Sequence, residues 1–199
     1  MRLMNQNINK IICVGRNFVK HIEELNNAFP QEMVLFQKSA STATRILIKP
    51  QESCRFEGEI SLLIENAKVK GVGLGLDLTL DDKQNYLKSK GLPWERAKSF
   101  KNAAVFTNFI AFDGNFQSLV MELYLNDKLQ QRALPEKMIY DFETILSQVD
   151  AVFGLEDGDV IMSGTPEGVS AFEEGDSIRL VLLQNDNILI DESFITKVV

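Results

Sequence analysis

The chain has 199 residues, of which 45% are hydrophobic and 25% are charged, values typical of one globular domain, here residues 1–199, with a sizeable core. Its net charge of −7 disfavours nucleic acid and anionic membranes as partners, because both attract clustered Lys and Arg. No apolar run is long enough to span a bilayer, and the chain shows no secretory signal, so we expect Cys13 and Cys54 to be reduced thiols in a cytoplasmic protein.

The first quarter of the chain predicts short strands around one helix. Strands are expected at the apolar runs 10–14, 33–37 and 45–48. The helix is expected from residue 18 to about 25, with Asn17 as its N-cap and Asn26-Asn27 at its end. His21 and Glu24 lie three residues apart and share a helical face, where the carboxylate could orient the imidazole. The alternative is a surface histidine with a chance acidic neighbour, which composition alone favours.

Residues 56–64 and 69–78 predict two longer strands that carry acidic side chains. Side chains alternate across a strand, so Glu57 and Glu59 project from one face of the first, and the second could deliver Asp77 beside them. Like charges about 4 Å apart repel by roughly 4 kcal/mol, so this cluster needs a cation or a protonated member. All-oxygen ligands suit Mg²⁺ or Mn²⁺. The alternative is the solvated face of an edge strand, which the two glutamates alone favour.

Two further helices are expected in the rest of the chain. Thr79 can cap one that runs to about residue 90, with Asp82 reaching back from the third helical position. Pro135 suits the first turn of the other, whose apolar residues recur at helical spacing as far as Gly154.

Strands and turns are expected around these helices. Residues 103–112 and 119–125 predict strands, and the second turns back at Asn126-Asp127. The loop 163–168 offers a hydroxyl and backbone amides suited to hold a carboxylate, although an ordinary turn is the simpler interpretation.

Several motifs in a fixed order connect these elements. They are Cys13–Phe18 with His21, Glu57-Gly58-Glu59, Asp77 before Thr79, Gly91–Trp94 with Ala97–Phe100, and Gly158–Gly168. Together they resemble the fumarylacetoacetate hydrolase family, in the small single-domain form that includes acylpyruvases and oxaloacetate decarboxylases. The resemblance covers almost the whole chain.

The resemblance implies a fold, a metal site and a set of roles. The implied fold is α+β and β-rich, with a rolled mixed β-sheet that cradles the metal, and the implied assembly is a homodimer. The metal ligands would be Glu57, Glu59 and Asp77, binding Mg²⁺ or Mn²⁺. The catalytic residues would be His21 and Glu24, a pair on a mobile segment that activates water, together with Lys98. The substrate-binding residues would be Gln84, Thr165 and Arg16.

This chain departs from the family pattern in four places. Asp81 stands where many members carry arginine, which puts the substrate preference in doubt. Phe18 replaces a tyrosine, and Lys38-Ser39 replaces a Lys-Pro pair. The link between Glu59 and Asp77 is shorter than in most members, so a more open pocket rim is expected.

The expected activity is divalent-metal-dependent hydrolysis of a C–C bond in a small 2,4-dioxo acid, such as an acylpyruvate or a fumarylacetoacetate-like substrate. Decarboxylation of oxaloacetate and isomerisation or tautomerisation of an enol acid are the first alternatives, because they use the same enolate. A non-catalytic protein that binds an oxo acid through a metal is the alternative from another class. Retention of Lys98, His21 and Glu24 favours an enzyme.

Overall fold

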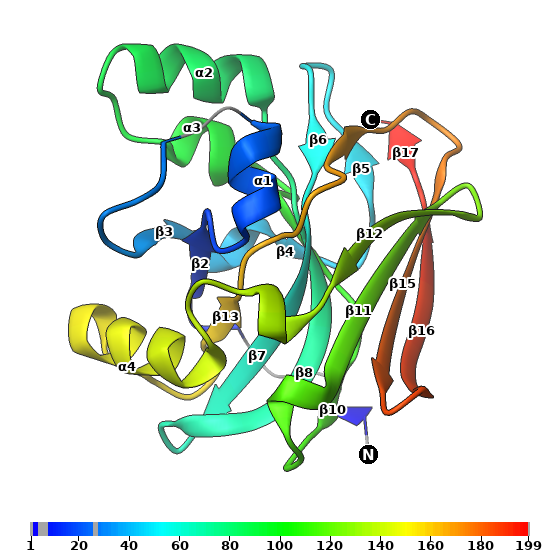
Figure 1. The fold of residues 1–199 in the computed structure, drawn as a ribbon. Helices are drawn as coiled ribbons and strands as arrows, with labels where there is room; N and C mark the ends of the chain where they lie inside the picture. The colour runs from blue at the N-terminus through cyan, green and yellow to red at the C-terminus, as the bar shows by residue number, and fades with distance from the viewer. Residues whose placement is uncertain (1, 4–7, 26–27, 199) are drawn as a thin grey trace.

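The computed structural model describes residues 2–3, 8–25 and 28–198, and these residues form many strands and four helices (Figure 1). The helices are α1 (Val19–Glu24), α2 (Asp81–Ser89), α3 (Glu95–Lys98) and α4 (Phe142–Phe153), with 3-10 turns η1 (Ala40–Thr42), η2 (Phe116–Ser118) and η3 (Pro135–Lys137). The strands are β1 (Arg2–Leu3), β2 (Ile11–Gly15), β3 (Val34–Lys38), β4 (Ala43–Thr44), β5 (Ile48–Lys49), β6 (Arg55–Phe56), β7 (Gly58–Glu65), β8 (Lys68–Asp77), β9 (Ala104–Phe106), β10 (Phe109–Ala111), β11 (Leu119–Leu125), β12 (Lys128–Ala133), β13 (Val160–Met162), β14 (Ser170–Ala171), β15 (Ser177–Gln184), β16 (Asn187–Ile195) and β17 (Lys197–Val198). None of the described helices is long and apolar enough to cross a membrane.

The larger sheet is mixed and curls on itself, as the family resemblance implied (Figure 1). Its strand order within the described residues is β1-β10-β8-β7-β13-β2-β3, and β9 joins β8 to β4. Strand β13 pairs parallel with β2 and antiparallel with β7, so a strand from the last quarter of the chain lies between two strands from its first third. The expectation of a rolled, β-rich α+β fold is therefore confirmed.

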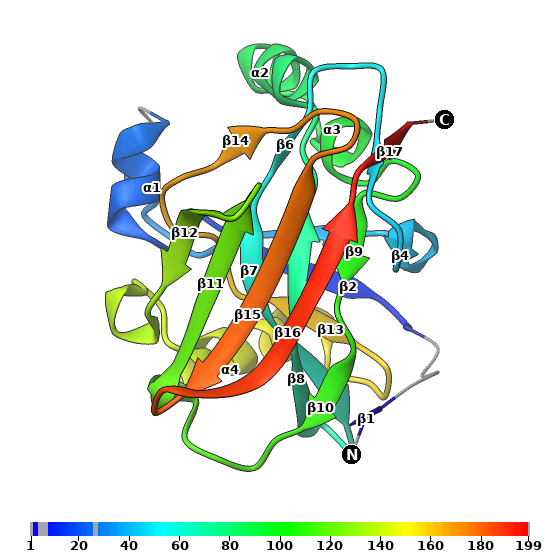
Figure 2. The same cartoon turned by 90° about the vertical axis from the view of Figure 1, so that its right-hand side faces the viewer.

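A second sheet, in the order β12-β11-β15-β16, packs against one face of the larger sheet (Figure 2). The contact depends on Gly58, because a Cβ there would lie 2.8 Å from Leu123 Cδ1 on β11. The backbone amide of Gly58 also donates a hydrogen bond to Gln131 Oε1 on β12, at 2.9 Å. The apolar face of β7, with Ile60, Leu62 and Ile64, forms part of the main core between the sheets.

A smaller apolar cluster lies on the opposite face of the larger sheet. It contains Leu63 of β7, Met162 of β13 and Cys13 of β2, all buried. Because both faces of β7 are covered, Glu59 in the middle of this strand is buried, whereas Glu65 at its end is partly exposed. Cys13 and Cys54 are free and buried, and burial raises the pKa of both thiols, so neither behaves as a reactive thiolate.

Two of the predicted helix caps are wrong because the capping side chains have buried partners elsewhere. Helix α1 begins at Val19, and Asn17 is buried, where its Nδ2 donates to the carbonyls of Tyr140 at 3.0 Å and Ser163 at 2.8 Å. Helix α2 begins at Asp81, and Thr79 Oγ1 instead contacts acidic and basic side chains of the site described below. The predicted helix end at Asn26-Asn27 lies outside the described residues.

Three further boundaries differ from the predictions. Helix α4 begins at Phe142, where Asp141 Oδ1 accepts from Thr144 N at 2.8 Å, and Pro135 opens the separate turn η3. The strand predicted at 103–112 is divided into β9 and β10, because the Thr107 hydroxyl between them accepts the backbone N–H of Leu74. Of the strand predicted at 45–48, only Ile48 lies in a strand, β5, and a bend at 45–46 separates β5 from β4.

Candidate active site

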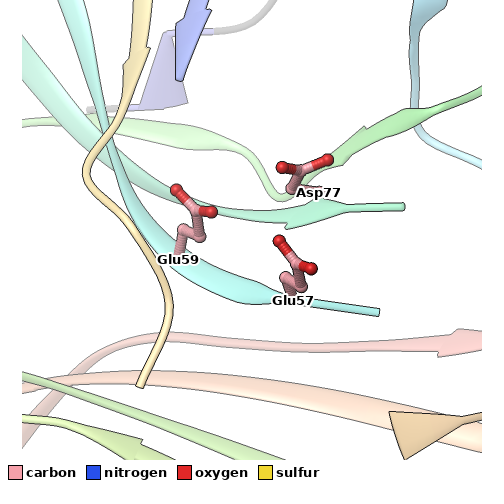
Figure 3. Close-up of side chains that lie close together, drawn as sticks. All are labelled: Glu57, Glu59 and Asp77. Atoms are coloured by element: carbon pink, nitrogen blue, oxygen red, sulfur yellow. The ribbon is translucent and has the colours of Figure 1, made fainter. Parts of the chain in front are cut away.

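Three carboxylates converge at the paired ends of β7 and β8. Asp77 N donates to Glu57 O at 2.8 Å, and Glu59 lies opposite Gly75, so Glu57, Glu59 and Asp77 share one face of the strand pair (Figure 3). One oxygen from each lies within 4.8 Å of the others. Glu57 is 6% exposed, Glu59 2% and Asp77 0%. The alternative of a solvated edge strand is therefore wrong, and we call these three residues the carboxylate cluster.

Two buried lysines hold one side of the carboxylate cluster. Lys98 Nζ at the end of α3 donates to Glu57 Oε2 at 2.8 Å, to Asp77 Oδ2 at 2.7 Å and to Thr79 Oγ1 at 2.6 Å. Burial opposes its charge, but the carboxylates of Asp77 and Glu57 outweigh burial and raise the pKa of Lys98. Lys38 Nζ, at the end of β3, lies 2.7 Å from Asp77 Oδ1. The ammonium of Lys98 therefore stays charged beside Asp77 at neutral pH.

Glu59 differs from the other two carboxylates. Its Oε2 accepts the backbone N–H of Gly164 at 2.7 Å, and among the described residues no cationic side chain forms an ion pair with it. Burial, followed by the charge of Asp77, raises the pKa of Glu59 well above its usual range. By contrast, Lys98 and Arg55 outweigh burial at Glu57 and lower its pKa. The cluster thus lacks a positive charge next to Glu59, which a divalent cation would supply.

The loop that contacts Glu59 needs glycine at position 164. Gly164 has a φ of +98°, and a Cβ there would lie 2.7 Å from Asn17 Cβ. The next residue, Thr165, accepts a hydrogen bond at Oγ1 from Gln131 Nε2 at 2.8 Å. Since Gln131 also accepts from Gly58 N, one buried amide ties this loop to the strand that carries the two glutamates.

The histidine and its acidic partner lie together on α1, as the helical spacing predicts. His21 is buried, and its Nδ1 lies 3.4 Å from Glu24 Oε2. Burial lowers the pKa of His21 against the opposing charges of Glu57 and Glu24, so the imidazole is neutral at pH 7. Glu24 Oε1 also accepts the backbone N–H of Gly168 at 3.0 Å, which seats α1 on the loop before β14. The surface-histidine alternative is therefore wrong.

A cavity of about 30 Å³ joins these groups. It is lined by Val14, Gly15, Arg16, His21, Leu25, Phe36, Arg55, Glu57, Glu59, Asp77, Gln84, Lys88, Trp94, Lys98 and Thr165. The lining includes every predicted metal-binding, catalytic and substrate-binding residue except Glu24, which contacts His21. This volume holds about one or two water molecules.

Three basic residues of this site were not among the predicted site residues, although the sequence around each one indicates a buried or inward-facing position. Lys38 ends an apolar run that predicts a buried strand, where a lysine needs a partner. Arg55 stands two residues before Glu57, so the same alternation that pairs Glu57 with Glu59 places it on their face. Lys88 stands four residues after Gln84 on the same face of α2.

Asp81 does not belong to the cavity lining. It lies in the first turn of α2, where an acidic side chain is favoured by the helix dipole. Its position gives no support to the idea that this acid contacts the substrate.

Comparison with known proteins assigns the chain to a family. Residues 10–190 match the family model described as Fumarylacetoacetate (FAA) hydrolase C-terminal. The oxaloacetate tautomerase YcgM of Escherichia coli (strain K12) is 33% identical over 197 residues, covering 89% of this chain and 90% of that protein. The mitochondrial oxaloacetate tautomerase FAHD1 of Homo sapiens is 32% identical over 187 residues, covering 85% of each chain.

Solved structures give the same result. A candidate fumarylacetoacetate isomerase/hydrolase from Oleispira antarctica has a TM-score of 0.92 and 37% identity, covering 96% of this chain and 95% of that one. A fumarylpyruvate hydrolase from Pseudomonas aeruginosa, crystallised with Mn²⁺ and pyruvate, has a TM-score of 0.86 and 25% identity, covering 96% and 91%. The match over residues 10–190 includes every residue of the cavity lining, and the chain therefore belongs to the fumarylacetoacetate hydrolase family.

Proposed function

We propose that this enzyme acts on small 2-oxo acids by forming and protonating their enolates at a divalent cation, and that tautomerisation of oxaloacetate is its principal reaction. The observation that carries the proposal is one cavity in which a buried carboxylate cluster faces both a neutral imidazole and a permanently charged ammonium. The oxaloacetate tautomerases among the relatives support the choice of reaction.

The carboxylate cluster fits Mg²⁺ or Mn²⁺. Glu57, Glu59 and Asp77 offer oxygen donors only, and the buried carboxylate of Glu59 has no ion-pair partner among the described residues. When bound, the cation would act as a Lewis acid toward the carboxylate and 2-oxo oxygens of the substrate. The Mn²⁺ in the Pseudomonas aeruginosa fumarylpyruvate hydrolase supports a divalent cation here, and Mg²⁺ is equally compatible with the donor set.

Lys98 would stabilise the negative charge that develops on the substrate. Its ammonium is fixed by Glu57, Asp77 and Thr79, and its raised pKa keeps it protonated at neutral pH. It is therefore an electrostatic group and not a base. A charge that is already in place needs no reorganisation as an enolate forms.

His21 is the side chain best suited to move the proton. Its lowered pKa leaves the imidazole neutral at pH 7, and Glu24 orients the ring through Nδ1. In tautomerisation His21 would take a proton from C3 of oxaloacetate, the C–H electron pair would form the C2–C3 double bond, and the 2-oxo oxygen would receive a proton to give the enol. The reverse transfers regenerate the keto form.

Hydrolysis of an acylpyruvate is the second candidate, because the His21–Glu24 pair can equally activate water. His21 would accept a proton from a water molecule that attacks the distal carbonyl. The C–C bond would then break, and its electron pair would leave as the enolate of pyruvate. The structural similarity to a fumarylpyruvate hydrolase supports this candidate.

One set of assays separates these reactions. The purified protein is given oxaloacetate or acetylpyruvate with Mg²⁺, with Mn²⁺ and with EDTA, and enol–keto conversion, CO₂ and pyruvate are measured. We expect metal-dependent enol–keto conversion of oxaloacetate. Pyruvate from acetylpyruvate as the faster reaction would make the protein a hydrolase, and CO₂ from oxaloacetate would make it a decarboxylase. Binding of oxo acids without any turnover would instead support the non-catalytic alternative.

Two expectations, one from the family resemblance and one from the sequence itself, remain predictions. We expect a homodimer, which light scattering of the purified protein would test. We also expect a cytoplasmic location, which microscopy of the tagged protein in its own cell would test.

A further inference from the structure

Arg55 lines the cavity and contacts the carboxylate cluster only at Glu57. Its Nε donates to Glu57 Oε1 at 3.1 Å, whereas the other oxygen, Oε2, faces Lys98. Its Nη2 donates to Gln84 Oε1 at 3.1 Å. The guanidinium thus lies beside Glu57 on the side away from Lys98. Among the described residues Nη1 has no acceptor, so donors remain for a ligand.

Lys88 is a second cation of the cavity lining. Its Nζ lies 5.3 Å from the centre of the Trp94 ring, and among the described residues it forms no ion pair. Burial, followed by the charges of Arg16, Arg55 and Lys98, lowers the pKa of Lys88 to about 8. An ammonium in this position, crowded by other cations, would be stabilised by an anion. We call Arg55 and Lys88 the basic wall.

The charges of the cavity lining favour a ligand with more than one negative charge. Besides Arg16, the lining holds the three carboxylates of the cluster and the cationic side chains of Arg55, Lys88 and Lys98. With a divalent cation bound, these six side chains and the cation would carry two positive charges in excess. A 2-oxo acid with one carboxylate offsets one of them, and a dicarboxylic 2-oxo acid offsets two.

From this geometry we infer that the basic wall binds a second carboxylate of the substrate, so that the enzyme selects dicarboxylic over monocarboxylic 2-oxo acids. The inference rests on the proposed function, because it assumes that the first carboxylate and the 2-oxo oxygen lie at the carboxylate cluster. Arg55 presents paired N–H donors that match a carboxylate, and Lys88 adds a mobile point charge.

The test compares two stable acids of equal chain length that differ in one carboxylate. Binding of 2-oxoglutarate and of 2-oxopentanoate is measured by calorimetry in the presence of Mn²⁺, for the wild type and for Arg55→Gln, Lys88→Met and Lys90→Met. Lys90 is the matched control, because it lies at the exposed end of the same helix and outside the cavity lining. The affinity of every variant for Mn²⁺ alone is measured first, since Arg55 contacts Glu57.

We expect the wild type and Lys90→Met to bind 2-oxoglutarate about 10-fold or more tightly than 2-oxopentanoate, the scale of a charged hydrogen bond. Arg55→Gln should remove most of that preference, and Lys88→Met part of it, while binding of 2-oxopentanoate stays unchanged. If Arg55→Gln does not fold, the inference is tested by Lys88→Met alone. This variant should fold, because the half-buried Lys88 side chain forms no ion pair with the described residues.

The possible failures are distinguishable. Equal binding of the two acids by the wild type, or an equal loss for both acids in the variants, overturns the inference and leaves the proposed function intact. Binding of neither acid with Mn²⁺ present would overturn the proposed function, and the inference with it.

Discussion

The carboxylate cluster and the basic wall line one cavity, but they are built differently. Glu57, Glu59 and Asp77 come from two hydrogen-bonded strands, and each is at most 6% exposed. Arg55 and Lys88 come from the short strand β6 and from helix α2, and Lys88 contacts an aromatic ring in place of a counter-ion. The cluster is fixed by backbone register, whereas the wall depends on long side chains.

This difference separates two tasks of the site. A cluster fixed by a strand pair holds its geometry whatever the substrate, which suits the chemistry common to enolate-forming reactions. A wall of flexible cations can change between related proteins without disturbing the sheet, which suits the choice among oxo acids. We therefore expect changes in the cluster to abolish turnover and changes in the wall to alter selectivity.

The largest effect is expected from Glu59→Gln. The cation would lose a ligand, so the affinity for Mn²⁺ should fall about 10²-fold or more and metal-dependent turnover about 10³-fold or more. Stability in EDTA should not fall, because a buried carboxylate without a cationic partner becomes a neutral amide. Glu65→Gln, on the same strand but paired with Lys70 outside the cavity, is the control. Wild-type affinity for Mn²⁺ in Glu59→Gln would contradict the assigned ligand set.

Lys38→Met tests how far the cluster depends on its buried counter-ions. Removing one partner of a buried ion pair typically costs about 3–5 kcal/mol, because it leaves the other charge uncompensated. Lys38 and Asp77 are both buried, so we expect a loss of that size in the free energy of unfolding, measured by urea titration in EDTA. Lys88→Met in the basic wall should lose less than about 1 kcal/mol. Equal losses for the two variants would refute the distinction between a fixed cluster and an adaptable wall.

The parts of the fold that could be predicted are those set by local patterning. Apolar runs and period-two alternation predicted β2, β3, β7, β8 and β11, and the alternation correctly placed both glutamates on one face. The wrong predictions were helix caps and several element boundaries. Asn17 and Thr79 have the right chemistry for caps, but tertiary contacts use their side chains elsewhere. Such competition depends on residues at least 19 positions away, which a local pattern does not contain.

The site, like the fold, has residues that local patterns predicted and residues that they did not. Strand alternation placed Glu57 beside Glu59, helical spacing paired His21 with Glu24, and the family resemblance supplied the other candidate residues and all the roles. The structure brings all the candidates but Glu24 into the cavity lining. Lys38, Arg55 and Lys88 were missed because a basic residue in a sequence is usually exposed. Their significance depends on which strand or helix lies across the cavity, and only the sheet topology determines that. The roles assigned to all these residues remain predictions.

His21→Ala is expected to have the next largest effect. Hydrolysis of acetylpyruvate and tautomerisation of oxaloacetate should fall by about 10²-fold or more, the usual loss when a general base is removed. Decarboxylation of oxaloacetate needs no base to form the enolate and should fall much less. The affinity for Mn²⁺ should be unchanged, since His21 is not one of the cluster residues. Lys20→Ala, on the exposed side of the same helix, is the control. Wild-type rates in His21→Ala for both proton-transfer reactions would remove its assigned role.

The smallest effect is a shift in the pH dependence of turnover. Burial lowers the pKa of His21 from 6.5, so the imidazole stays neutral as the pH falls through 6.5 and is protonated only below that value. At saturating metal and substrate, kcat should therefore be flat from pH 7.5 to about 6.5 and then fall, approaching tenfold per pH unit below the shifted pKa.

The variant Glu24→Gln tests the direction in which the pKa of His21 shifts. Glu24 raises the pKa of His21 through its charge and its hydrogen bond, so the neutral amide should move the acid limb of the profile to lower pH. The maximal kcat should also fall, because Glu24 orients the ring and accepts a hydrogen bond from Gly168 N. The pH at which kcat begins to fall does not depend on that maximal value. A limb that moves to higher pH, or that stays in place in Glu24→Gln while His21→Ala abolishes it, would show that Glu24 does not act on the charge of His21. The pair would then serve only to seat helix α1 on its loop.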